Sequence, residues 1–331
     1  MANHEIDFVV PWVDDTDPEW RDKKKKYVGV EIKAGSEDAR YRDWDTLKYW
    51  FRGVEKFAPW VRYVYFLTDD QKPEWLNTDH PKLKWIKHTD YMPKEYLPTF
   101  NSNVIELNLH RIEDLSEHFV YFNDDIFLID ETTPEDFFVE GVPCDLPRLG
   151  AFTPCNFFSH IIFNNSFLIN RHFNLRNSIA KDKKKWTKCQ SLDGRLRVAI
   201  YGRKSFLSES VSHHIQLSLK KSNFETLWRE EYPCLHATCL NKLRGKNDVS
   251  VWCVRDWQLL SGEFHPKKPI GQYFHTSTMS QNNNAIEYIR KQKGKTVCLN
   301  DTEDEKDFEL HKQMIIAEFE KLFPEKSSFE K

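Results

Sequence analysis

Two carboxylates and an amide stand together at Asn123, Asp124 and Asp125, after the apolar run 119–122 and before a second apolar run at 126–129. A buried strand that ends in such residues brings them to the rim of a sheet, where open α/β folds bind their ligands. Adjacent carboxylates repel each other, and a hard divalent cation relieves that repulsion. The run therefore predicts a metal and phosphate site. Taken alone, an Asx turn that closes a hairpin between two strands explains it equally well.

The same pair of residue types recurs at Asn300 and Asp301, after a short apolar run at 296–299 that reads as a buried strand. Two strand ends of this kind can hold one cation between them, and Mg²⁺ or Mn²⁺ prefers such oxygen ligands and commonly bridges a diphosphate. The sequence contains no GxxxxGK[ST] and no GxGxxG, which disfavours a P-loop kinase and a dinucleotide dehydrogenase. By fold analogy, a nucleotide-sugar enzyme remains.

The elements that must position these residues alternate between strand and helix. The apolar run 6–13 reads as a buried strand and is followed by an acidic turn; a helix with Asp43 as its N-cap spans 44–57; and a second strand at 61–67 also ends in acids. A third strand follows at 83–86. This order predicts an α/β fold with a doubly wound, mostly parallel sheet.

A further helix is expected to lead directly into the Asn-Asp-Asp strand. Its N-cap lies within 99–103, its apolar positions are spaced at 105, 109, 112 and 115, and Glu106, His110 and Glu113 share one stripe near the site. Asp248 is expected to cap a later helix that ends at Gly262. The aperiodic, aromatic segment 142–206 reads as a helical or irregular insertion that shapes the acceptor side of a single catalytic domain spanning 1–331.

The totals exclude several classes of protein. With 331 residues, 40% hydrophobic and 14% aromatic, the chain is globular and not disordered. A net charge of −3 disfavours nucleic-acid binding. The seven cysteines form no CxxC, which argues against a disulfide framework, and a zinc site at Cys234, His236 and Cys239 with His213 or His214 lacks a second paired spacing.

No apolar run approaches the roughly 20 residues that a bilayer-spanning helix needs. A cytoplasmic protein is therefore expected. The basic runs at 23–26 and 181–185 read either as solvated loops or as contacts with an anionic membrane, which would place the protein peripherally at the inner face.

Short motifs follow one another in a recognisable order along nearly the whole chain, from residue 6 to about residue 324. They are 6–14 (IDFVVPWVD), 42–45 (RDWD), 58–61 (APWV), 97–102 (LPTFNS), 109–113 (LHRIE), 121–125 (YFNDD), His214, 243–244 (LR), Asp248 and 298–301 (CLND). This series resembles the four conserved regions of the Stealth family. That family contains bacterial capsular polysaccharide phosphotransferases and the animal N-acetylglucosamine-1-phosphotransferase.

The resemblance implies transfer of a sugar 1-phosphate from a nucleotide diphosphate sugar, usually a UDP-sugar, to a hydroxyl of a capsular or cell-surface glycan that is free or lipid-linked, with release of UMP. By motif position, catalytic roles fall on Asp124, Asp125, His214 and Arg244. Metal binding falls on Asp125, Asn300 and Asp301. Substrate contacts fall on Trp12, Asp14, Arg42, Asn101, Ser102, His110, Arg111 and Asn123. The family's His-x-Pro reads His214-Ile215-Gln216 here, which leaves His213 and His214 both open as the functional histidine.

These roles agree with the chemistry of phosphoryl transfer. The attacked atom is the phosphorus that carries the sugar, so the protein must neutralise charge on phosphoryl oxygens and hold nucleophile and leaving group in line. Arginine binds such oxygens bidentately, and a neutral histidine can accept the proton of the acceptor hydroxyl. The alternatives are a metal-dependent glycosyltransferase that releases UDP and a non-catalytic glycan-binding protein.

Overall fold

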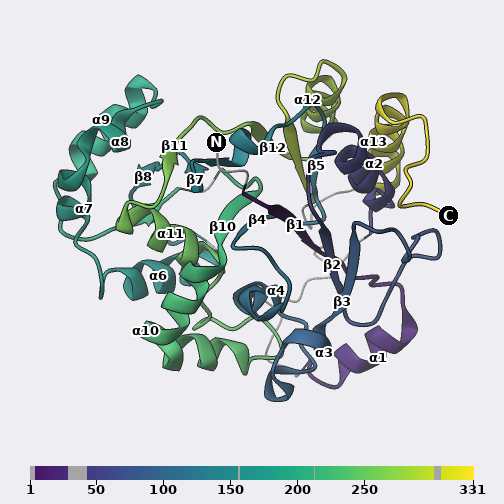
Figure 1. Cartoon of the computed structure of the whole chain (residues 1–331), viewed down its shortest axis with the longest axis horizontal. Helices are drawn as coiled ribbons and strands as arrows, with labels where there is room; N and C mark the ends of the chain where they lie inside the picture. Colours follow the sequence, from purple (N-terminus) through teal and green to yellow (C-terminus); the bar gives the residue numbers. More distant parts are fainter. Residues whose placement is uncertain (1–3, 29–42, 156, 212, 302–306) are drawn as a thin grey trace.

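The structure is a computed structural model that describes residues 4–28, 43–155, 157–211, 213–301 and 307–331. Its central sheet has the strand order β10–β4–β1–β2–β3 (Figure 1). The strands are β10 (Leu217–Lys220), β4 (His118–Tyr121), β1 (Ile6–Pro11), β2 (Val64–Thr68) and β3 (Leu83–Lys87). All neighbours pair in parallel except β10, which is antiparallel to β4 at one edge. The predicted mostly parallel sheet is confirmed.

Helices cover both faces of this sheet because successive strand residues point to opposite sides. On one face, Phe8, Val10 and Phe66 pack in a core with side chains from α2 (Leu47–Phe57), α12 (Met279–Arg290) and α13 (Phe308–Leu322). On the other face, Val9 and Phe119 pack with α4 (Ser102–Leu107), α10 (Lys221–Cys239) and α11 (Trp252–Ser261). The fold is thus doubly wound, as predicted.

The chain leaves the central sheet at the Asn-Asp-Asp run. After β4 it enters β5 (Ile126–Leu128), which pairs not with β4 but with β13 (Thr296–Asn300), and β13 in turn pairs with β12 (Gly271–His275). Residues 123–125 therefore connect two different sheets. The hairpin explanation of this run is wrong.

The remaining elements surround the two sheets. They are α1 (Pro18–Lys25), α3 (His88–Tyr91), α5 (Pro134–Phe137), β6 (Phe138–Val139), β7 (Val142–Asp145), β8 (Leu149–Gly150), β9 (Glu209–Ser210) and β11 (His265–Pro266). Four helices, α6 (Phe158–Ile169), α7 (Leu175–Lys181), α8 (Lys183–Thr187) and α9 (Leu192–Tyr201), occupy most of the segment expected to be an insertion. Its status as an insertion within one catalytic domain stays a prediction. Among the described helices, none combines the length and apolar character that crossing a bilayer requires.

Three expected helices differ from the structure. The helix expected from residue 44 begins at Leu47 with Thr46 at its N-cap position, so Asp43 does not cap it. The helix that begins after Asn101 ends at Leu107, and a separate 3₁₀ turn follows at Leu109–Arg111, because the Asn108 side chain donates to Val104 O and accepts from Arg111 Nε. Glu106 and His110 consequently do not share one stripe. Asp248 does not cap α11, which begins only at Trp252. It is fully buried and holds a loop instead.

Candidate active site

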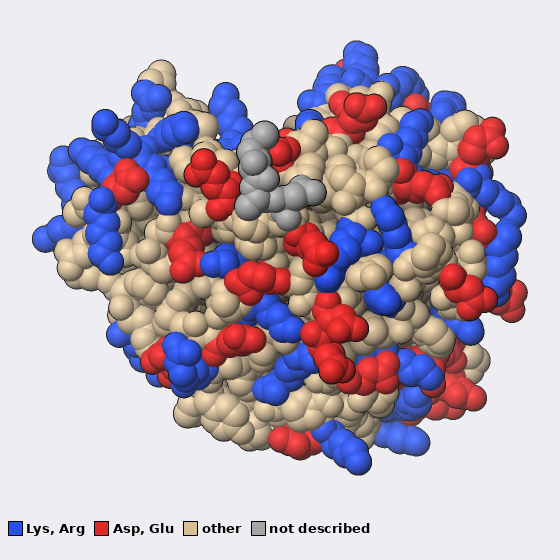
Figure 2. Space-filling model, viewed as in Figure 1, with Lys and Arg blue, Asp and Glu red and all other residues tan. Residues whose placement is uncertain are grey.

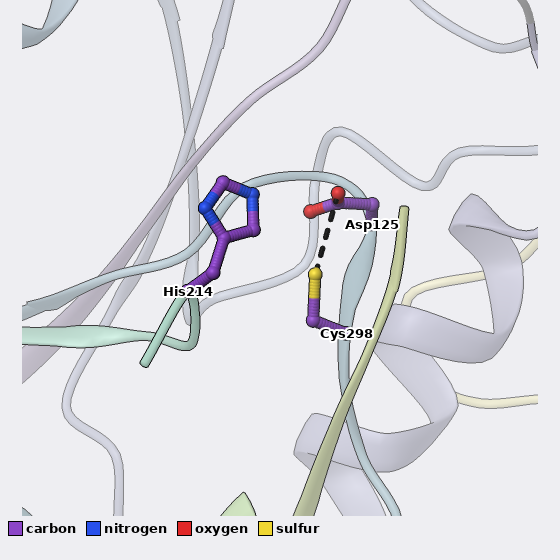
Figure 3. A group of neighbouring side chains, drawn as sticks. All are labelled: Asp125, His214 and Cys298. Atoms are coloured by element: carbon purple, nitrogen blue, oxygen red, sulfur yellow. Dashed lines mark hydrogen bonds between the residues drawn. The ribbon is translucent and has the colours of Figure 1, made fainter. Parts of the chain in front are cut away.

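Asp125, His214 and Cys298 come together from three separate parts of the chain (Figure 3). One potential ligand atom from each lies within 4.8 Å of the other two. Asp125 precedes β5, and Cys298 reaches it because β13 runs antiparallel to β5 with Cys298 opposite Ile126. The backbone N–H of Leu299 also donates to Asp125 O, at 2.9 Å. His214 precedes β10 and has a φ of 48°, in the left-handed region, a strained conformation of the kind that recurs at functional sites.

One oxygen of the Asp125 carboxyl group accepts a hydrogen bond, and the other oxygen accepts none from the described residues. Cys298 Sγ donates to Oδ2 at 3.5 Å, while Oδ1 is buried and has no hydrogen-bond partner among the described residues. Burial raises the pKa of Asp125, and the nearby His214 and the Cys298 thiol oppose that rise. Burial, together with the Asp125 charge, also raises the pKa of the Cys298 thiol well above its usual value. Cys298 is therefore a protonated donor at neutral pH.

Further carboxylates surround Asp125 on the side away from the sheet core. The Asp124 residue as a whole is exposed, but the surrounding protein partly withdraws its carboxyl group from water. This desolvation raises the pKa of Asp124 to about 7, and the charges of Asp125 and Asp43 add to the rise. Burial likewise raises the pKa of Asp43 to about 6, with smaller contributions from Asp45 and Asp14. These acids therefore lie close enough to destabilise one another's charge. A divalent cation with a preference for oxygen ligands relieves such repulsion.

The predicted metal partners Asn300 and Asp301 lie at the end of β13, next to the same loop. Trp44 Nε1 donates to Asp301 Oδ2 at 3.2 Å, which ties the end of β13 to the segment that carries Asp43. The carboxylates fit Mg²⁺ or Mn²⁺. Because the Cys298 thiol keeps its proton and is a soft donor, it fits this cation poorly as a ligand and well as a group that orients Asp125.

Arg244 lies beside a second acid, Glu106. Arg244 Nη2 donates to Ser102 Oγ at 2.6 Å, and its guanidinium carbon lies 5.5 Å from the centre of the Phe158 ring. Burial raises the pKa of Glu106, while Arg244 and hydrogen bonds from Tyr121 and Ser102 oppose that rise. The Arg244 guanidinium is thus positioned at the first turn of α4.

The loop that carries Arg244 is fixed by a buried polar network. Asp248 Oδ2 accepts hydrogen bonds from Asn101 Nδ2 at 2.7 Å and from Gly245 N at 2.9 Å, and Asp248 Oδ1 accepts from Asn241 Nδ2 at 2.6 Å. Asn101 is fully buried and also caps α4. Asn101 is thus tied to the loop that carries Arg244, and its predicted contact with substrate stays a prediction.

A recess of about 300 Å³ lies between the two groups; its lining includes Glu106, Asn123, His214 and Trp252. The Tyr121 hydroxyl spans its wall, 3.1 Å from Glu106 Oε1 and 2.8 Å from Asn123 Oδ1. Asn123, predicted as a substrate contact, thus lines this recess. Glu106, the neighbour of Arg244, and His214, the neighbour of Asp125, thus line the same recess.

A second recess of about 540 Å³ shares His214, Ile215, Leu217 and Trp252 with the first. Its lining carries three cations, Arg255, Lys267 and Lys268, and two acids, Asp136 and Asp145. Arg255 pairs with Asp145 at 2.7 Å, and Lys267 pairs with Asp136 at 2.9 Å. Lys268, which also lines this recess, is exposed and forms no ion pair with any residue the structure describes.

The two histidines left open by the sequence have different surroundings. His214 faces Asp125, and its ring meets the ring of Tyr273 edge-on at 5.1 Å. His213 lines only the larger recess, where burial and the Arg255 charge lower its pKa. His214 is thus the histidine that the structure brings to the acids.

The structure does not bring every predicted residue to this group. His110 stacks against Phe224 and Trp228 of α10, and the Arg111 guanidinium lies 4.7 Å from the Trp228 ring centre. Trp12 and Asp14 follow β1: the Trp12 ring packs against Phe66, whereas Asp14, which accepts two hydrogen bonds from Thr16, lies near enough to Asp43 to raise its pKa. Arg42 lies outside the described residues. The conceivable zinc ligands of α10 have other partners, since His236 bonds Tyr96 and Cys239 accepts from Asn108.

Sequence reasoning gives no site role to Cys298 or Trp252. The signal for Cys298 is available, because it lies two residues before Asn300 on a strand and so points to the same side of the sheet. Asp43 is expected only as a helix cap and as part of the RDWD motif, and Glu106 only as part of a helix stripe near the site. Trp252, and the neighbourhood of Glu106 with Arg244, become visible only when α4, β4 and α11 are placed together.

Comparisons with known proteins agree on one family. Three family descriptions match: Stealth protein conserved region 1 at residues 4–29, conserved region 2 at 40–144 and conserved region 4 at 287–331. The capsular polysaccharide phosphotransferase WcwK of Streptococcus pneumoniae is 40% identical over the full length of both chains. The receptor polysaccharide phosphotransferase WefC of Streptococcus gordonii is 36% identical over 98% of both.

One further sequence relative and one solved structure are also similar to this chain. The exopolysaccharide phosphotransferase cps2G of Lactiplantibacillus plantarum is 36% identical over 99% of this chain and 96% of its own. Among solved structures, the galactosyltransferase LgtC in complex with donor and acceptor sugar analogues aligns over 94% of this chain and 95% of its own, with a TM-score of 0.39 and 10% identity. The assignment rests on the sequence relatives.

Proposed function

This chain belongs to the Stealth protein family, and we propose that it is a phosphotransferase that moves a sugar 1-phosphate from a nucleotide diphosphate sugar to a hydroxyl of a capsular or cell-surface glycan. The relatives named for capsular, receptor and exopolysaccharide phosphotransfer support the reaction class. The observation that carries the proposal is the convergence of Asp125 and His214, two recognised motif positions far apart in sequence, beside one recess.

In the proposed reaction, the acceptor hydroxyl oxygen forms a bond to the phosphorus that carries the sugar. The bond between that phosphorus and the oxygen of the nucleoside monophosphate breaks, and the electron pair leaves with the nucleotide. With a UDP-sugar donor, the products are UMP and a glycan with a sugar linked through a phosphodiester. The proton of the acceptor hydroxyl moves to a ring nitrogen of His214, which acts as general base.

The other residues supply positioning and charge. Arg244, held by Ser102 and by the loop that Asp248 anchors, would bind phosphoryl oxygens whose negative charge develops during transfer. Asp124, Asp125 and Asp301 would hold Mg²⁺ or Mn²⁺, which when bound neutralises the diphosphate. Cys298 orients the Asp125 carboxylate through its hydrogen bond.

The two recesses suggest where each substrate lies. The nucleotide diphosphate would lie on the side of the acids and Arg244, because that side offers both carboxylates for a cation and a guanidinium. The acceptor would occupy the larger recess, which also borders His214 and Trp252. In this arrangement His214 lines both recesses and could take the proton of the acceptor hydroxyl as that oxygen approaches the phosphorus.

The test is to identify the nucleotide product. The purified protein is incubated with a panel of UDP-sugars, Mg²⁺ or Mn²⁺ and a glycan acceptor, and the released nucleotide is separated by ion-exchange chromatography. Sugar-phosphate transfer yields UMP. Release of UDP would instead show transfer of the sugar alone, as a glycosyltransferase performs it, and absence of any turnover with unchanged glycan binding would show a binding protein.

A further inference from the structure

The four helices α6 to α9 with their connections, residues 158–206, form a helical lobe whose charge differs from that of the rest of the chain. This lobe contains eleven Lys or Arg and two Asp or Glu, whereas the whole protein has a net charge of −3. Figures 1 and 2, which share one view, show the basic side chains gathered where α8 and α9 lie. The lobe is therefore strongly cationic within a nearly neutral protein.

The outer face of α9 is apolar. Leu192, Leu196 and Ile200 are 85%, 58% and 53% exposed. A spacing of four residues places them on one side of the helix, and the buried Gly194 and Val198 lie on the other. A helix at the surface of a globular protein normally turns its apolar stripe inward and its charges outward. In α9 the largest aliphatic side chains point to solvent.

Basic residues surround this apolar stripe. Lys183 and Lys184 of α8 are exposed, and so are Arg195 of α9 and Arg203 just after it. The lobe is tied to the protein body through Asp193, which accepts hydrogen bonds from Arg197 and from Arg148 in the connection before β8. An apolar face flanked by cations is the pattern of helices that lie in the interface of a membrane.

We infer that the outer face of α9 with the flanking lysines and arginines docks onto an anionic lipid bilayer, with Leu192, Leu196 and Ile200 entering the boundary between headgroups and acyl chains. The positive charge of the lobe favours an anionic membrane over a second copy of the chain as its partner. A second copy of the chain would bring two cationic lobes together, which like-charge repulsion disfavours, whereas acidic phospholipids attract each lysine and arginine.

The place of this surface in the chain connects docking to the site. In the sequence, β9 follows the lobe and leads into the segment of His213 and His214. β9 pairs with β8, which precedes the lobe in the sequence. Docking would therefore attach the chain to the bilayer through the lobe that precedes the His214 segment. A benefit for transfer to a lipid-linked acceptor rests on the proposed function, but docking itself does not.

The experiment measures sedimentation of the full chain with lipid vesicles. We expect binding to vesicles of phosphatidylcholine mixed with phosphatidylglycerol to be at least about tenfold tighter than to vesicles of phosphatidylcholine alone, and to weaken as KCl rises, because salt screens the attraction. Equal binding to both vesicles, or no binding to either, would overturn the inference.

A variant tests the apolar face directly. The triple variant Leu192→Ser, Leu196→Ser and Ile200→Ser removes exposed side chains, so circular dichroism should show an unchanged fold, and binding to the mixed vesicles should fall at least about tenfold. The matched control is Leu240→Ser with Leu310→Ser, two leucines that are 45% and 48% exposed outside the lobe.

Each contrary outcome is specific. Wild-type binding by the triple variant, or an equal loss in the control, contradicts docking through α9. A dimer seen by light scattering that the triple variant abolishes would assign the face to a second copy. UMP release measured with a water-soluble acceptor should be the same for wild type and triple variant, so the failure of docking and the failure of the proposed function give different results.

Discussion

The thiol of Cys298 donates a hydrogen bond to the Asp125 carboxylate, with 3.5 Å between Sγ and Oδ2. Since the thiol keeps its proton at neutral pH, we expect it to position Asp125 and not to bind the metal. Cys298→Ser retains a donor and should keep kcat within about threefold of wild type, whereas Cys298→Ala should lower kcat by about tenfold, the effect of losing one supporting hydrogen bond.

Metal titration distinguishes positioning from ligation at Cys298. If the thiol is not a ligand, the Mg²⁺ or Mn²⁺ concentration for half-maximal rate stays within about threefold in Cys298→Ser. A loss of metal affinity in the serine variant, with a softer ion such as Zn²⁺ supporting activity in the wild type but not in the variant, would make Cys298 a ligand and our assignment wrong.

His214 and His213 are adjacent, yet only His214 faces Asp125. We expect His214→Ala to lower kcat at least about a hundredfold, as loss of a general base does, and His213→Ala, the matched control, to lower it less than about tenfold. Steady-state rates of UMP release measure both. The reverse order of effects would move the base to His213.

Arg244 should be sensitive even to a change that keeps its charge. Arg244→Ala is expected to lower kcat about a hundredfold, and Arg244→Lys should recover little of that loss, because an ammonium group cannot reproduce the fork that binds phosphoryl oxygens. Ser102→Ala, which removes its hydrogen-bond partner, should cost about tenfold. Full activity of Arg244→Lys would reduce the role of Arg244 to that of a general positive charge.

Strand-end acids are not equivalent in this fold. Asp125→Ala should lower kcat at least about a hundredfold. EDTA should abolish turnover by the wild type until Mg²⁺ or Mn²⁺ is restored. Asp70→Asn is the control: Asp70 also follows a parallel strand, β2, but its carboxylate pairs with Lys87. It should remain close to wild type. Undiminished activity in EDTA would exclude an essential exchangeable metal.

The sequence predicted the strands well because buried parallel strands are continuous apolar runs with polar ends. The strands at Leu83–Lys87 and Thr296–Asn300 appeared where expected, and so did the strand ends that carry Asp125 and Asp301. Which acids meet could not be deduced, since it depends on β5 leaving the central sheet to pair with β13. The hydrogen bond of Asn101 to Asp248 could not be deduced for a similar reason, because the two residues lie 147 positions apart.

His110 was expected to share a helix stripe with Glu106, but the helix ends at Leu107. The pH dependence of protein stability tests its buried position. Burial between Phe224 and Trp228, with the charges of Arg111 and Lys221, lowers the pKa of His110 to about 3. The unfolded chain binds a proton at a pKa of about 6.5, so this group stabilises the fold above that pH and ceases to do so as pH falls towards 3. At pH 5 the lost stability is at most about 2 kcal/mol.

His110→Phe keeps an aromatic ring in this place and removes the titration. Urea unfolding of both proteins at pH 8 and pH 5 measures the effect: wild type should lose up to about 2 kcal/mol more than the variant over this interval. The variant lacks the hydrogen bond between His110 and the Leu107 backbone at both pH values, so this loss cancels when the two changes in unfolding free energy are compared. We expect kcat/KM of the variant to stay within about threefold of wild type. A much larger drop, with unchanged pH dependence of unfolding, would return His110 to the substrate site that its motif position had suggested.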